Sequence, residues 1–349
     1  RKEGPSPRDR GRPSGCGSAA IAWHRVPVPT HGDKAKFYGN ARSTSSALGV
    51  ARVRVGPGQG AWDAARGDGA GARGRSSIAL VAAEDLVRFP ATPYLYTIDE
   101  RGRVTRDPEI TGELAGTADR ARAAILGALA LTPKKELYLD VHGVANDFDD
   151  AVIAAAEMWH YLGREGLTIA YTWPAGAKGL SFYTADRESG EFTVLHLKEL
   201  LRLLADIPEI EKIHIAAHSR GTDVASTAVR ELVIEARAAG IDPRKRYRIA
   251  NMLLVAADLD LDVAMQRFGG EALGAAVGRM TIYTNANDSA LASAQALFRS
   301  RQRVGAVKPT QLTPTQQAFM QRAVNLDVIV YEGQGGGIFR HGYFRDPIA

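Results

Sequence analysis

The sequence contains one cysteine, Cys16, among 349 residues. A single thiol excludes an internal disulfide and any zinc site built on cysteines. The sequence also lacks an apolar run of the ~18 residues that a transmembrane helix needs, so we expect no transmembrane segment. Apolar residues make up 45% of the chain and charged residues 24%, which is typical of a soluble globular protein.

The chain has little excess charge outside its first twenty residues. The formal net charge is +5, and residues 1–20 contribute +3 of it, with five Lys or Arg and two Asp or Glu. A balanced remainder argues against a nucleic-acid surface, including one formed by the Arg- and Gly-rich segments, so we expect no nucleic-acid partner. Residues 1–20 also lack an apolar core, so they do not form an intact signal peptide. The first residue is Arg rather than Met, which fits truncation or processing upstream.

Motifs that bind metals or nucleotides are missing as well. No His, Asp or Glu cluster has the spacing of metal ligands, and H-E-x-x-H is absent. The stretch Gly56-x-Gly58-x-x-Ala61 resembles the start of a dinucleotide-binding loop, but no helix with an apolar face follows it. We therefore expect neither a metal ion nor a cofactor.

Composition and pattern divide the chain into three parts. Residues 1–35 are predicted to be a disordered basic tail. Residues 36–90 are predicted to be an N-terminal extension with strands at 47–55 and 77–81 around a Gly- and Arg-rich loop. Residues 91–349 are predicted to be the catalytic domain.

Strands and helices alternate through most of the third part. Short apolar runs predict strands at 136–141, 167–173, 212–217, 248–257, 280–284 and 326–332. Apolar residues at helical spacing predict helices between them, including 147–163, 192–206 and the segment after Gly221. This order predicts an α/β fold with a mostly parallel central sheet and helices on both faces.

The sequence "AHSRG" places Ser219 where a strand gives way to a helix. Such a junction suits a nucleophile elbow, a sharp turn that requires small residues beside the serine. Ala217 and Gly221 are small, although Ala217 replaces the first glycine of G-x-S-x-G. The alternative interpretation is that Ser219 simply caps the helix.

A nucleophilic serine needs a general base and a carboxylate that orients it. His341 is the only histidine after Ser219 and follows the last predicted strand on a Gly-rich loop. Asp288 follows the strand at 280–284, which gives the order Ser, Asp, His at successive strand ends. Asp258 follows the preceding strand and is kept as the alternative acid, although we favour Asp288.

An oxyanion hole needs two backbone N–H groups. We assign them to Arg220, the residue after the serine, and to Val144 in the "HGV" turn after the strand at 136–141. The Arg220 side chain has two interpretations: it binds an acidic group on the substrate, or it pairs with a neighbouring Asp. His142 and His218 are interpreted as buried structural histidines.

Together these residues resemble the α/β-hydrolase superfamily, and within it a bacterial family of uncharacterised, esterase-like serine hydrolases. The resemblance runs from about Tyr94 to Tyr343. Relatives typically have an aromatic residue in place of Val144 and a methionine in place of Arg220. The resemblance implies the fold and a Ser219-Asp288-His341 triad, but no particular substrate. It rests on "HGVANDFDDA" (142–151), "TWPAGAKGLSFYTADRES" (172–189), "AHSRG" (217–221), "AADLD" (256–260), "NDSAL" (287–291) and "HGYF" (341–344).

The predicted function is therefore that of a serine hydrolase acting on small-molecule carboxylic esters through an acyl-enzyme. Thioesters and amides stay open as substrates. The alternative is a non-catalytic α/β-hydrolase scaffold with a binding or envelope-associated role. The short segment between 257 and 280 predicts a site without a lid, unless residues 299–325 cover it. The oligomeric state stays open, as does the compartment, either the bacterial cytoplasm or the envelope after processing.

Overall fold

The computed structural model describes residues 16–27, 37–55, 78–177, 181–333, 335, 337 and 339–345. The Gly- and Arg-rich loop expected after residue 55 lies outside these residues, as does most of the expected tail. The described part of the chain contains no helix that is long and apolar enough to cross a membrane.

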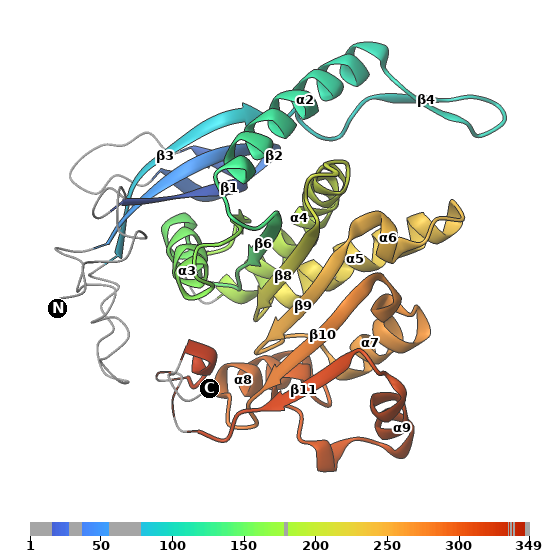
Figure 1. Cartoon of the computed structure of the whole chain (residues 1–349). Coiled ribbons are helices and arrows are strands. Elements are labelled where there is room, and N and C mark those ends of the chain that lie inside the picture. The colour runs from blue at the N-terminus through green and yellow to red at the C-terminus, as the bar shows by residue number, and fades with distance from the viewer. Residues whose placement is uncertain are drawn as a thin grey trace, which may run out of the picture.

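The core of the molecule is a nine-stranded sheet with the order β11-β10-β9-β8-β6-β7-β1-β2-β3 (Figure 1). Six neighbouring strands, in the order β11-β10-β9-β8-β6-β7, pair in parallel, which confirms the predicted sheet. β1 pairs in parallel with β7, and β2 runs antiparallel to both β1 and β3. The strands are β1 Cys16–Pro27, β2 Tyr38–Val55, β3 Ile78–Arg88, β6 Glu136–Val141, β7 Leu167–Thr172, β8 Lys212–His218, β9 Ile249–Val255, β10 Val277–Thr284 and β11 Leu326–Val330, with a separate hairpin of β4 Tyr96–Ile98 and β5 Val104–Arg106.

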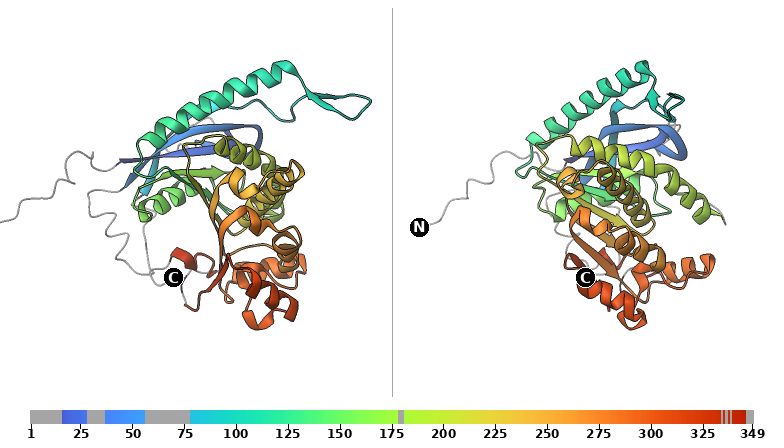
Figure 2. Two further views of the ribbon diagram at one scale, coloured as in Figure 1. Left: turned by 45° about the vertical axis from the view of Figure 1, so that its right-hand side comes forward. Right: turned by 90° about the vertical axis from the view of Figure 1, so that its right-hand side faces the viewer.

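Helices cover both faces of the sheet, as the alternating pattern predicts. α4 packs against α5 on one face, and α3 lies against β7 and β2 on the other. Figure 2 shows α2 beside the β2–β3 end of the sheet, with α8 and α9 at the β11 end. The helices are α2 Pro108–Ala130, α3 Phe148–Tyr161, α4 Phe182–Ala205, α5 Gly221–Ala238, α6 Pro243–Tyr247, α7 Leu261–Met265, α8 Ser289–Phe298 and α9 Pro314–Arg322.

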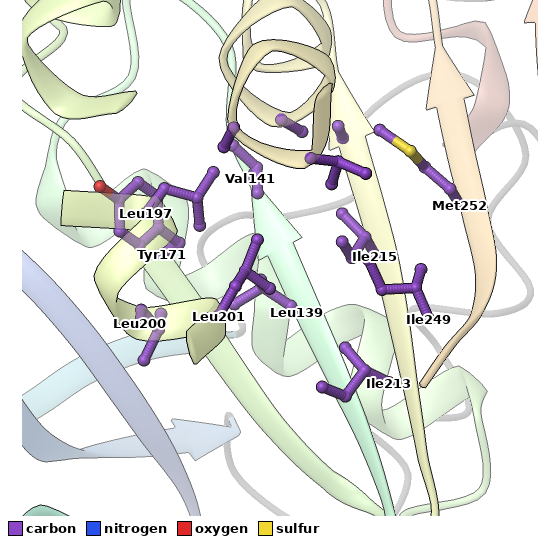
Figure 3. Packing of buried hydrophobic residues seen from close by; sticks show 14 of the residues in the cluster. Leu139, Val141, Tyr171, Leu197, Leu200, Leu201, Ile213, Ile215, Ile249 and Met252 are labelled. Carbon is purple, nitrogen blue, oxygen red and sulfur yellow. The ribbon is translucent and has the colours of Figure 1, made fainter. Parts of the chain in front are cut away.

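Successive side chains along each strand point to opposite faces of the sheet, so the core has one part on each face. Ile169 and Tyr171 of β7 belong to the larger cluster, whereas Ala170 between them packs with α3. This alternation is the period of two that a pleated strand imposes. Figure 3 shows part of the larger cluster where α4 crosses the sheet, with Leu201 near Leu139 of β6 and Leu197 near Tyr171 of β7.

The structure corrects two of the predicted boundaries. Residues 16–27 form β1 rather than part of a disordered tail, because their backbone pairs with β7 about 150 residues later and with β2. The strands of residues 36–90 continue the central sheet, so the predicted extension is not a separate unit from 91–349. Both errors arose because strand pairing over long sequence distances leaves little signal in local composition.

α4 begins at Phe182, ten residues before the predicted start at 192. The polar residues and Gly190 in this first part suggest a loop when they are read locally. In the structure Gly190 lies against α5, where an added Cβ would stand 3.3 Å from Val224 Cγ2. The early start matters because the first turns of α4 reach the candidate site.

Candidate active site

The predicted site residues follow the carboxyl ends of adjacent parallel strands. Ser219 follows β8, Asp258 follows β9, Asp288 follows β10, and His341 comes after β11. Because parallel strands end at the same edge of a sheet, residues far apart in the sequence gather there. In Figure 1 this edge lies where the arrowheads of β8 to β11 point.

Ser219 sits on a strained turn held by backbone hydrogen bonds. Its φ angle is 52°, in the left-handed region that residues other than glycine seldom adopt. The Ser219 N–H donates to the carbonyl of Val255 (2.9 Å). The Ser219 carbonyl accepts from the Thr222 amide (3.1 Å) and hydroxyl (2.7 Å), and from the Asp258 amide (3.2 Å). The surrounding structure therefore fixes a conformation that is unfavourable by itself.

Two glycines allow the backbone to approach closely around this turn. A Cβ on Gly221 would lie 2.3 Å from the Val141 carbonyl oxygen and 2.4 Å from that of His142. A Cβ on Gly143 would lie 2.7 Å from Ser219 Cβ. Since both contacts are too short for any side chain, the "HGV" turn and the serine turn are packed directly against each other.

The structure brings His341 and Asp288 together. His341 Nδ1 lies 2.7 Å from Asp288 Oδ2, and the Asp288 side chain is fully buried while that of His341 is 20% exposed. The other Asp288 oxygen accepts from the Leu291 amide (3.0 Å) at the start of α8. The His341 ring also contacts His218, with 4.8 Å between ring centroids, and this places the His341–Asp288 pair beside the serine turn.

The loop that carries His341 is anchored by Tyr343, which is fully buried. Its hydroxyl donates to the Tyr283 carbonyl (2.8 Å) and accepts from the Ala256 amide (3.2 Å). Burial raises the pKa of Tyr343, so the hydroxyl keeps its proton at neutral pH. No role of Tyr343 was predicted from the sequence, where its place two residues after His341 and next to Phe344 was the available signal.

The amides of Val144 and Arg220 have no acceptor among the residues that the structure describes. The Gly143 carbonyl is bound by Asn146 Nδ2 (3.3 Å) and contacts His142 Nδ1 (2.8 Å), and the Ser219 carbonyl is bound as described above. In a trans peptide the C=O and N–H groups point in opposite directions. The N–H groups of Val144 and Arg220 therefore point away from the groups that bind the carbonyls of the preceding residues, Gly143 and Ser219.

His142 is a buried structural histidine in one defined tautomer. Its Nε2 accepts from the Trp173 backbone amide (3.0 Å), so Nδ1 carries the ring proton and donates to the Gly143 carbonyl. The ring stacks on the Trp173 indole, whose Nε1 donates to the His142 carbonyl (2.8 Å). The histidine therefore fixes the turn that carries Val144 rather than acting as a base.

Asp186 is a further residue whose role the sequence analysis missed. It is fully buried on the early part of α4, and Oδ2 accepts from the Ala145 amide (2.9 Å) and the Gly176 amide (3.0 Å). Its Oδ1 accepts from the Ala177 amide (3.0 Å). One carboxylate thereby holds the loops after β6 and β7 together. Placing the helix start at 192 left Asp186 outside any element and concealed this role.

Asp258, the alternative acid, is buried in a different network. Tyr183 of α4 donates to its Oδ2, and Arg303 Nε lies 3.5 Å from its Oδ1, with both side chains almost fully buried. Burial raises the pKa of Asp258, and the Arg303 charge opposes that rise. Within the described part of the chain, Asp258 makes no hydrogen bond to His341.

The Arg220 side chain is also buried, with 6% of its surface exposed. It pairs with Asp223 one turn later (2.5 Å) and lies 3.7 Å from Glu191 of α4. Arg267 binds the other Asp223 oxygen. Of the two interpretations of Arg220, the structure therefore favours the pair with a neighbouring Asp. Burial lowers the pKa of Arg220, and the charges of Arg187 and Arg303 lower it further.

Residues 312–323 do not cover the site. α9 leads directly into β11, and Asn325 Nδ2 donates to the carbonyls of Gly274 (2.9 Å) and Val277 (3.1 Å) before β10. These contacts place α9 at the amino ends of β10 and β11, opposite the edge that carries Ser219. Between β9 and β10 the structure describes only α7 and short helical turns, so this segment supplies no lid. The earlier part of 299–325 does reach the edge that carries the site, because the Gly305 amide donates to the Ala257 carbonyl after β9 (2.9 Å).

The mostly parallel sheet, the serine on a strained strand-to-helix turn and the His–Asp pair beyond it define an α/β-hydrolase. The chain belongs to the family described as "Alpha/beta hydrolase of unknown function (DUF900)", whose model matches residues 117–348. In the described part of the chain, no three or more His, Cys, Asp or Glu residues are grouped so that they could hold a metal ion.

Some solved structures are similar to this chain at low identity and low TM-score. An uncharacterised protein from Bacillus cereus is 14% identical with a TM-score of 0.36, over 64% of this chain and 63% of that one. Esterase B from Lactobacillus rhamnosis is 14% identical (TM-score 0.32; 58% and 66% covered), and an esterase from Pyrococcus furiosus is 13% identical (TM-score 0.32; 57% and 73%). The chain thus spans just under two thirds of the first two proteins. No curated protein matches it.

Replacing Arg303 by methionine tests the buried ion pair. Removing one partner leaves the Asp258 charge uncompensated, which we expect to lower the free energy of unfolding by ~3 kcal/mol near pH 8. The folded-state pKa of Asp258 is already above its unfolded value and rises further in the variant. The loss in the free energy of unfolding caused by Arg303→Met is therefore small at low pH, and it grows as the pH rises through the folded-state pKa of Asp258.

Urea unfolding of Arg303→Met and the wild type at pH 5 and pH 8 measures this change. Arg202→Met is the matched control because Arg202 pairs with Glu235 at the surface, where a pair contributes roughly 0–1 kcal/mol. A deficit that is the same at both pH values would contradict the assignment of a charged Asp258.

Proposed function

We propose that the protein is a serine hydrolase that cleaves carboxylic esters through an acyl-enzyme. Ser219 is the nucleophile, His341 the general base and acid, and Asp288 the residue that orients His341. The observation that carries the proposal is the 2.7 Å contact between His341 Nδ1 and the buried Asp288 carboxylate, beside a serine held at positive φ. This combination fits nucleophilic catalysis better than helix capping, because the N-cap position of α5 belongs to Arg220 rather than Ser219, and no side chain makes a capping hydrogen bond there.

Asp288 determines which nitrogen of His341 is available as a base. Because the buried carboxylate accepts from Nδ1–H, Nε2 keeps its lone pair and can remove the hydroxyl proton of Ser219. The negative charge of Asp288 then stabilises the imidazolium that forms. Asp288 takes no proton from His341 during the reaction, so His341 alone transfers protons.

In the first half of the reaction, Ser219 Oγ attacks the ester carbonyl carbon while its proton passes to His341. The resulting oxyanion accepts hydrogen bonds from the Val144 and Arg220 amides, which form the oxyanion hole. Collapse breaks the C–O bond to the alcohol, which leaves with the proton from His341. Water then attacks the acyl-enzyme in the same way and releases the acid and free Ser219.

Ser219→Ala removes the nucleophile and is expected to lower kcat for a nitrophenyl ester by ~10⁴- to 10⁶-fold. A fluorophosphonate probe should label the wild type and leave the variant unlabelled. Because Ala removes only an oxygen, circular dichroism and thermal unfolding should match the wild type. Near-normal ester turnover by a folded Ser219→Ala preparation would refute the proposed nucleophile.

Asp288→Asn and Asp258→Asn distinguish the two candidate acids. Asn at 288 keeps an oxygen for the Leu291 amide but presents N–H groups to His341, which disfavours the productive tautomer and should lower kcat by ~10⁴-fold. Asn at 258 keeps an acceptor for Tyr183 and should lower kcat by less than about tenfold.

The measurement is kcat for nitrophenyl butyrate in both variants, with urea unfolding to show that each is folded. A larger loss of kcat in folded Asp258→Asn would move the acid to the end of β9.

A further inference from the structure

The first turns of α4 present one row of side chains toward the serine turn. Tyr183, Arg187 and Glu191 follow each other at intervals of four, so they lie on the same face of the helix. Tyr183 binds Asp258, whose amide holds the Ser219 carbonyl. Glu191 lies 3.7 Å from a guanidinium nitrogen of Arg220, the residue after the nucleophile. Arg187 is therefore flanked on both sides by contacts to the site.

Arg187 is held beside an aromatic ring that it shares with a second arginine. Its guanidinium lies 5.1 Å from the centre of the Phe298 ring, and Arg303 lies at the same distance from that ring. Tyr183 packs on Phe298 too, with ring centroids 5.2 Å apart. Contact with an aromatic face positions a guanidinium without neutralising its charge.

Positive charge exceeds negative charge in this cluster. Asp258 pairs with Arg303, whereas Asp223 is shared by two arginines. Among the residues that the structure describes, Arg187 has no carboxylate partner, and it is also exposed. Arg187 is close enough to Arg220 to lower the pKa of that guanidinium. The described cluster consists of Arg187, Arg220, Arg267, Arg303, Asp223, Asp258 and Glu191.

We propose that Arg187 is a specificity residue that binds a carboxylate on the substrate, so that the enzyme prefers esters bearing a carboxylate remote from the scissile bond. This inference rests on the proposed function. Arg220 cannot fulfil this role because its side chain is buried against Asp223. Arg187 is exposed, lies against Phe298 and has no carboxylate partner within the described part of the chain, so its fork of N–H donors can bind a carboxylate of the substrate.

The test compares mono-(4-nitrophenyl) adipate with its methyl ester, which has the same acyl chain without the charge. We expect the wild type to have the higher kcat/KM for the acid. Arg187→Gln should lower kcat/KM for the acid about tenfold, mainly through KM, because a charge-assisted hydrogen bond is lost. The value for the methyl ester should stay within about twofold, and Arg187→Lys should retain part of the preference.

Arg202→Gln is the matched control, because Arg202 lies on the same helix four turns further on, and both values should be unchanged. A wild type that prefers the methyl ester, or an Arg187→Gln variant that changes both substrates equally, would overturn the proposal. Fluorophosphonate labelling distinguishes a failure of the proposed substrate class from a failure of the proposed function. Labelling of Ser219 without turnover of either ester refutes the substrate class alone, whereas no labelling refutes the proposed function and this inference with it.

Discussion

The backbone of Ser219 is the constraint on which the rest of the site depends. A positive φ at a non-glycine residue costs about 1–3 kcal/mol, and it persists here because three other residues hold the Ser219 backbone. Val255 at the end of β9 binds its amide, and Thr222 in the first turn of α5 and Asp258 after β9 bind its carbonyl. The same contacts direct the Arg220 amide away from α5, so the strained turn exposes the proposed nucleophile and one half of the proposed oxyanion hole together.

The neighbouring segments are arranged around that turn. Gly143 lies against Ser219, and the structural histidine before it locks the peptide that carries the Val144 amide. Asp186 then joins this loop to the loop after β7. On the other side, Tyr343 anchors the His341 loop to the ends of β9 and β10. The proposed reactive groups thus lie on loops, but each loop is fixed by a buried polar side chain that stabilises its position.

The hydrophobic pattern of short segments predicted those strands, helices and site residues whose signal lies within the segment itself. The apolar strands and the helix after Gly221 follow from period and composition, and the order Ser219, Asp288, His341 follows from the strand ends. Contacts distant in sequence were not predictable in this way. β1 pairs with a strand about 150 residues away, and Asp186, Tyr343 and Arg187 gain their roles only when α4 and the last loop reach the sheet edge. Arg220 illustrates the limit, because the sequence placed its charge beside Ser219 but could not show that Asp223 pairs with it.

The most direct test of the central claim is a crystal structure of the protein after reaction with an alkyl fluorophosphonate. We expect phosphorus bonded to Ser219 Oγ, with one phosphonyl oxygen about 2.7–3.1 Å from both the Val144 and Arg220 amide nitrogens. His341 should keep its contact with Asp288 and direct Nε2 toward the Ser219 oxygen. Phosphorus on another residue, or a phosphonyl oxygen directed away from both amides, would contradict the proposal that the strained turn at Ser219 forms the reaction centre.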